Sequence, residues 1–229
     1  LPQCLVARRQ VKLRRQEISD PAAKRSRHRP WHSAKNHQPP VPRGDSHRLA
    51  TIGEKSVEMT AEMADAWLPA FFMAEGADAV WGDALRAGQR KRDPGRPPLD
   101  IYAGGAVAIG NNLESYRDMS RSGIALYVGG MGAKEKNFYN QVFRKYGYEA
   151  EAEAIQELYL SGRKSEAEAA IPQSYLDATS LVGSPGFVKD RLVALKEHGV
   201  TSLNVSFLGT TSHERVAHCD ALKNLLATI

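Results

Sequence analysis

A glycine cluster beside two lysines is the stretch of this chain best suited to contact a ligand. Segment 124–148 reads IALYVGGMGAKEKNFYNQVFRKYGY, so an apolar run leads into Gly129, Gly130 and Gly132. Glycines let a backbone turn tightly and approach a ligand closely. The pattern therefore predicts a loop over 129–132, either as part of a ligand site or as an ordinary turn before a packed helix.

The residues after the cluster predict a helix over 135–146. Its apolar side chains recur at helical spacing and share one face; they are Phe138, Tyr139, Val142, Phe143 and Tyr146. Further helices are predicted over 54–65, 75–87, 112–121, 150–160 and 165–170.

Two more helices are indicated by their start signals. Ser184 and Pro185 are a typical cap and first-turn residue, and Gly199 would end that helix. Thr211 and Glu214 have the spacing of a capping box and predict the start of the final helix.

Four segments predict strands that alternate with these helices: 49–53, 66–72, 99–109 and 201–207. Successive strand–helix units favour a parallel α/β architecture. The stretch 88–98 is predicted to be a solvated loop whose charges need no partner.

The sequence of the central stretch resembles a known signature. ALYVGGMGAKEKNFYN (125–140) is similar to a motif of bacterial luciferase-like oxidoreductases, in the branch that uses the deazaflavin coenzyme F420. Flanking segments 50–69, 100–110 and 181–209 occur in the order such proteins show. The resemblance covers 49–229 and implies the C-terminal half of a (β/α)₈ TIM barrel.

The resemblance implies where a cofactor would lie. In a barrel, strand-to-helix turns face the catalytic side, and helix starts favour anions. Glycine within a strand also marks close backbone approach. The implied cofactor contacts are Thr51, Ile52, Gly53, Lys55, Gly104, Gly105 and Gly209. Glu54 departs from the proline that is usual there, and its carboxylate would repel a phosphate.

The helices between 112 and 170 would form an insertion that shapes the substrate pocket. The pocket candidates are Tyr127, Gly129, Gly130, Met131, Asn137 and Tyr139, although Tyr139 could equally be a core residue. The proton donor of such enzymes lies on early strands, so no catalytic residue is assigned. No metal-ligand spacing is present.

Charge divides the chain into two predicted regions, 1–48 and 49–229. The first holds 12 basic and 3 acidic residues, whereas the second holds 19 basic and 23 acidic residues. The mildly acidic second region has no basic face for nucleic acid. No apolar run is long enough for a membrane span, and two distant cysteines fit a reducing cytoplasm.

Three interpretations remain for region 1–48. It could be a basic arm, a transit peptide, or an out-of-frame translation that is disordered or weakly helical. Its excess of arginine, proline and histidine favours the last, and Leu1 in place of methionine favours a fragment or processed product.

The predicted function is hydride transfer between F420 and a small unsaturated or carbonyl compound. An FMN-dependent luciferase-like monooxygenase and a non-catalytic remnant are the alternatives. The full barrel would be a homo-oligomer. A half barrel would expose unpaired strand edges near Leu49 and Thr201, and is expected to be catalytically silent and poorly soluble.

Overall fold

The structure is a computed structural model that describes residues 46–229. The interpretations of region 1–48 therefore lie almost entirely outside the described residues and stay predictions. Within the described part, no helix is long and apolar enough to cross a membrane.

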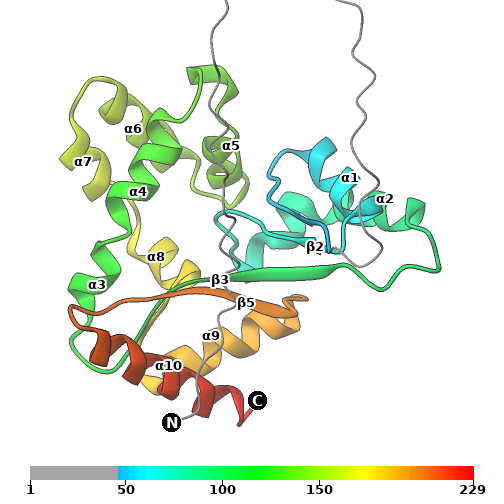
Figure 1. Cartoon of the computed structure of the whole chain (residues 1–229). Coiled ribbons are helices and arrows are strands. Elements are labelled where there is room, and N and C mark those ends of the chain that lie inside the picture. The colour runs from blue at the N-terminus through cyan, green and yellow to red at the C-terminus, as the bar shows by residue number, and fades with distance from the viewer. Residues whose placement is uncertain (1–45) are drawn as a thin grey trace, which may run out of the picture. The chain divides into compact units, whose positions relative to one another are not determined.

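A parallel sheet organises the described residues, which confirms the predicted α/β class (Figure 1). Its five strands are β1 (Arg48–Leu49), β2 (Ala66–Trp67), β3 (Asp100–Ile109), β4 (Leu181–Gly183) and β5 (Ser202–Phe207). Strand β4 was missed by the sequence analysis because three residues are too few to show a period. Strand β2 is shorter than the predicted 66–72, since Pro69 lacks the N–H that a ladder requires.

The long strand β3 is the centre of the sheet. It pairs with β2 at its start, with β4 at its end, and with β5 from Tyr102 to Val107. Strand β5 thus lies directly beside β3, whereas a half barrel in chain order would place it next to β4. Of the described strands, β1, β4 and β5 each pair along one edge only, so the expectation of open edges at both ends of the sheet is met.

Helices α1 (Glu54–Met63) and α2 (Asp83–Lys91) pack together beside β2. A 3-10 turn (Ala74–Gly76) and a π-helical segment (Asp78–Gly82) lead into α2. The predicted helix 75–87 is therefore confirmed in position but continues four residues further.

The loop after α2 is held by a buried arginine, contrary to the prediction that its charges need no partner. Arg92 is 6% exposed and donates to the carbonyl oxygens of Ala61 and Ala64 at 3.0 and 2.8 Å. These carbonyls lie at the end of α1, where helical partners run out. Arg96 also pairs with Asp65 at 3.0 Å.

Most of the insertion between β3 and β4 is helical, as predicted. Its helices are α3 (Glu114–Asp118), α4 (Arg121–Ala125), α5 (Phe138–Lys145), α6 (Glu149–Leu160), α7 (Lys164–Ala169) and α8 (Gln173–Thr179). Helix α8 was not predicted. The insertion has its own apolar core, in which Phe143, Ile155 and Tyr175 are almost fully buried.

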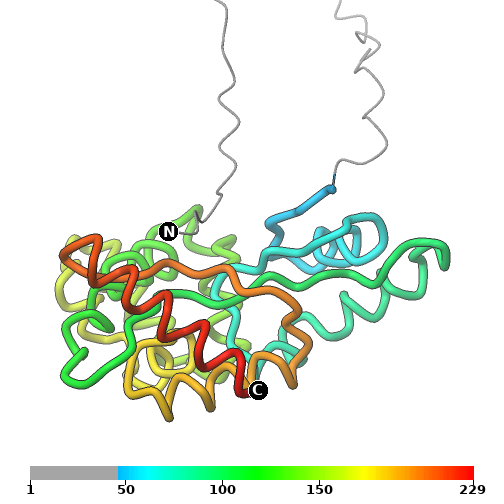
Figure 2. Tube along the Cα trace, turned by 60° about the horizontal axis from the view of Figure 1, so that its bottom comes forward, coloured from blue at the N-terminus to red at the C-terminus, as the bar shows by residue number. Residues whose placement is uncertain are grey.

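Helices α9 (Pro185–Glu197) and α10 (Ser212–Leu226) lie side by side along β3 and β5 (Figure 2). Both predicted starts are confirmed. The Ser184 hydroxyl accepts from the backbone N–H of Phe187, and Thr211 forms the capping box with Glu214. The insertion lies on the other side of these strands (Figure 1).

Candidate functional site

Gly129 and Gly130 serve helix packing in this structure. The predicted loop is wrong here, because Leu126–Gly130 is a π-helical continuation of α4. A Cβ at Gly129 would lie 2.5 Å from the Cβ of Tyr159, and one at Gly130 would lie 2.4 Å from its ring. The glycines therefore let this segment approach α6. Only Gly132, at φ 97°, adopts the turn conformation that the cluster suggested.

Asn137 is a helix cap, and its polar atoms are used within the fold. Its amide nitrogen donates to the carbonyl oxygens of Tyr127 and Val128 at 2.8 and 3.0 Å. Its oxygen accepts from the backbone N–H groups of Tyr139 and Asn140. Asn137 is also 2% exposed, so its side chain contacts the protein itself, and its place in a substrate pocket stays a prediction.

Two other pocket candidates do come together. The rings of Tyr127 and Tyr139 lie 4.7 Å apart, and each packs edge-on against Phe71, at 5.7 and 5.5 Å between ring centroids. We call Phe71, Tyr127 and Tyr139 the aromatic triad. Met131, the remaining candidate, is 37% exposed just beyond the π-helical segment.

Phe71 was missed by the sequence analysis, and its backbone is unusual. Its φ is 56°, in the left-handed region that side chains other than glycine rarely adopt. The hydroxyl of Tyr146 donates to the Phe71 carbonyl at 2.9 Å and accepts from the Met73 N–H at 3.1 Å. Burial raises the pKa of Tyr146, so its hydroxyl keeps the proton that it donates.

One cavity lies beside β3 and has a volume of about 270 Å³; we call it the β3 cavity. Residues 102–106 line it, together with Phe71, Phe72, Ser180 and Asn204 among others. Predicted cofactor residues Gly104 and Gly105 are therefore in its wall.

Both of these glycines are required by the protein's own backbone. A Cβ at Gly104 would lie 2.6 Å from the carbonyl oxygen of Asn204, and one at Gly105 would lie 2.7 Å from that of Thr179. Their φ angles are 156° and 143°. The two glycines predicted that another backbone approaches β3 closely. In the structure, β5 and the end of α8 make this approach.

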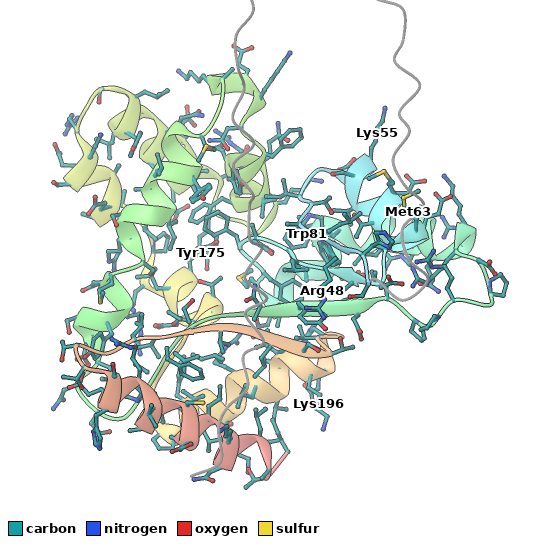
Figure 3. The ribbon with its side chains drawn as sticks, viewed as in Figure 1. Arg48, Lys55, Met63, Trp81, Tyr175 and Lys196 are labelled. Carbon is teal, nitrogen blue, oxygen red and sulfur yellow. The ribbon has the colours of Figure 1, made fainter. Side chains whose placement is uncertain are left out.

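A second cavity lies at the turn between β1 and α1 and has a volume of about 440 Å³; we call it the α1 cavity. Ile52, Gly53 and Lys55 line it, so three of the four predicted residues of this turn meet there. Lys55 extends into solvent, away from the buried Trp81 (Figure 3). Thr51 is instead engaged within the fold, where its carbonyl accepts from the indole N–H of Trp67.

The charges at the α1 cavity are arranged around the start of α1. Gly53 is the N-cap, and no side chain caps the first turn. The carboxylate of Glu54 lies 2.5 Å from the ammonium of Lys145 on α5, and this hydrogen bond lowers the pKa of Glu54. The negative charge that the sequence analysis expected at this turn is present, but it is paired.

Gly209 lies at neither cavity. Its carbonyl accepts from the guanidinium of Arg215 at 2.8 Å, and its φ is 147°. It belongs to the loop that begins α10. Within residues 46–229, no group of three or more potential metal ligands is present.

Comparisons with known proteins bear on this geometry. A family profile described as luciferase-like monooxygenase matches residues 13–202. The match begins inside the region that the sequence resemblance left out, and the domain boundary after residue 48 stays a prediction.

One curated relative and one solved structure are similar to this chain. The chain is 33% identical over 162 residues to "Putative coenzyme F420-dependent oxidoreductase Rv3520c" of Mycobacterium tuberculosis. This alignment covers 69% of this chain and 46% of that protein. The coenzyme F420 dependent tetrahydromethanopterin reductase from Methanopyrus kandleri superposes with a TM-score of 0.55 at 20% identity. That alignment covers 75% of this chain and 47% of the reductase. The chain therefore spans under half the length of each relative, and the second likeness shows the fold.

Proposed function

The chain belongs to the luciferase-like monooxygenase family, and we propose that it acts as an oxidoreductase in which coenzyme F420 exchanges a hydride with a small organic substrate. The observation that carries the proposal is the identity with the mycobacterial relative, whose name states F420 dependence. When bound, the cofactor would supply the hydride chemistry. The protein would bind it, orient it and exclude water.

The α1 cavity fits an anionic part of the cofactor. The uncapped first turn of α1 offers backbone N–H groups at the positive end of a helix, where anions are stabilised. Ile52, Gly53 and Lys55 would hold the group there. Glu54 opposes an anion, but its pairing with Lys145 reduces the repulsion.

The β3 cavity would hold the uncharged reacting groups. Gly104 and Gly105 remain predicted to border the cofactor, and the aromatic triad continues from the cavity wall at Phe71. The wall holds no Asp, Glu, His or Lys, so among the described residues it offers no general acid or base of those types. The catalytic proton donor stays unassigned.

Titration of the full chain with F420 and with FMN, followed by cofactor fluorescence, tests the proposal. F420 should bind more tightly than FMN. Gly53→Leu should weaken F420 binding at least tenfold, because the new side chain fills the α1 cavity, roughly the effect of losing one well-made binding contact. Gly186→Leu is the matched control, since a Cβ at Gly186 meets nothing within 4 Å.

Each contrary result selects an alternative. FMN binding as tight as F420 binding would favour an FMN-dependent monooxygenase. Failure to bind either cofactor, in a chain shown to be folded by circular dichroism, would favour a non-catalytic remnant.

A further inference from the structure

Strand β5 is the longest open edge among the described strands. It pairs with β3 along one side, and no described strand pairs with its other side. The remaining strands with one paired side offer less, because β1 has two residues and the three residues of β4 are all buried. A row of unpaired backbone N–H and C=O groups is a template for another strand.

The hydrogen bonds of β3 show which backbone groups of β5 face the open side. Asp100 donates its N–H towards β2, so the even-numbered residues of β3 face β2 and the odd-numbered ones face β5. The odd-numbered residues of β3 then bond to even-numbered residues near β5, as Val107 does in accepting from the Leu208 N–H at 2.9 Å. Leu203 and Val205 therefore turn their N–H and C=O groups to the open side.

The sequence of β5 has none of the features that block a sheet edge. Natural proteins protect such edges with charged side chains, proline or a bulge. Segment 199–212 reads GVTSLNVSFLGTTS and contains no charged residue and no proline, and the pairing of β5 with β3 is continuous. By contrast, β1 carries Arg48, whose guanidinium lies over the Tyr102 ring at 5.1 Å. Nothing in β5 opposes a further strand.

The two faces of β5 make its edge self-complementary. Leu203, Val205 and Phe207 pack against the core that α9 and α10 cover, whereas Asn204 and Ser206 are exposed on the other face. Two copies of β5 related by a two-fold axis perpendicular to the sheet would run antiparallel. Apolar side chains would then lie opposite apolar ones, and polar opposite polar, without any pair of like charges.

Helix α10 extends the same surface. It runs along β5 (Figure 2) and leaves Val216 58% and Leu226 40% exposed. Its two acidic and two basic residues balance, so a second copy of the helix meets no net repulsion. The two-fold arrangement places both copies of α10 on one face of the joined sheet, where these apolar side chains can be covered.

We propose that two copies of this chain associate through β5, antiparallel to each other, and form one continuous sheet across a two-fold axis. The partner is a second copy because the edge matches itself in charge and in the alternation of its faces. Each copy uses its β5 edge once, so association through this edge ends at the dimer. The inference goes beyond the proposed function and does not depend on cofactor binding.

The mass and the hydrogen exchange of the full chain test the proposal. Light scattering should give twice the 25.2 kDa of one chain, and the mass should fall towards that of one chain on dilution. Amide exchange followed by NMR examines the edge directly. The amides of Leu203 and Val205 should exchange slowly in the dimer and rapidly in the dilute monomer, whereas that of Asn204, which faces β3, should be slow in both.

A double substitution on the exposed face of β5 locates the interface. Ser202→Lys with Ser206→Lys should raise the dissociation constant of the dimer about tenfold, because like charges on adjacent strands repel and lysine blocks a sheet edge. Ser115→Lys with Ser165→Lys is the matched control, since it adds the same charge at two exposed serines of the insertion. The control should leave the dissociation constant unchanged.

Four results would overturn the inference. These are a monomer at every concentration, a mass that keeps growing with concentration, rapid exchange of Leu203 and Val205 in the dimer, or a dimer that both lysine pairs affect equally. A monomer in which Leu203 and Val205 exchange slowly would show that the edge is paired within one chain. If the β5 variant does not fold, the dilution series on the unmodified chain still decides the matter.

Discussion

Replacing Tyr146 by phenylalanine should destabilise the fold by removing one hydroxyl. That hydroxyl donates to the Phe71 carbonyl and accepts from the Met73 N–H, so two backbone groups lose their partner at once. Both residues are partly exposed, and water can replace some of what is lost. We expect the free energy of unfolding to fall by about 1–3 kcal/mol, the usual cost of leaving such groups unpaired.

A second consequence concerns the left-handed backbone at Phe71. A non-glycine residue in this conformation carries strain on the order of 1–3 kcal/mol, which persists only when the surroundings impose it. Without the Tyr146 hydroxyl, the loop should relax and the Phe71 ring should leave the wall of the β3 cavity. Tyr146→Phe should therefore also reshape the β3 cavity, although Tyr146 does not line it.

Urea unfolding followed by circular dichroism measures the first effect. Tyr148→Phe is the matched control, because the Tyr148 hydroxyl makes a single exposed contact with the Ser174 hydroxyl at 3.1 Å. Its loss should cost less than about 0.5 kcal/mol, as for most surface changes. If Tyr146→Phe costs no more than Tyr148→Phe, the Tyr146 hydroxyl does not hold the Phe71 loop.

Two further substitutions test the packing in the insertion. Tyr175→Phe should raise the free energy of unfolding by about 1 kcal/mol, because the fully buried Tyr175 hydroxyl has no partner among the described residues; a loss of stability in urea unfolding would contradict this. Gly129→Ala should lower stability by about 1–3 kcal/mol through its clash with Tyr159, whereas Gly186→Ala should not. Equal thermal midpoints for the two alanine variants would show that the segment adjusts freely.

Local signals account for what the sequence predicted well. The caps at Ser184 and at Thr211 depend on residues three positions apart, and both are present as predicted. The long strand β3 and the helices α6 and α7 are likewise present, α6 as its apolar face predicted and α7 as its alanine and glutamate content predicted. In such segments the propensity and the fold agree.

What the sequence could not show depends on contacts between distant residues. The conformation of Phe71 is fixed by Tyr146, which lies 75 positions later in the chain. The burial of Arg92 depends on carbonyls about 30 positions earlier. A glycine pair in sequence also does not reveal whether a ligand or a neighbouring helix fills the space that it leaves.

That ambiguity decides how the candidate site is understood. At Gly104, Gly105, Gly129 and Gly130, the space that a Cβ would fill is occupied by the protein's own atoms. The motif glycines therefore shape the site indirectly, by letting β5, the end of α8 and α6 approach closely. We therefore expect any ligand contact at the β3 cavity to come from side chains outside the motif, such as Phe71, which Tyr146 holds in place.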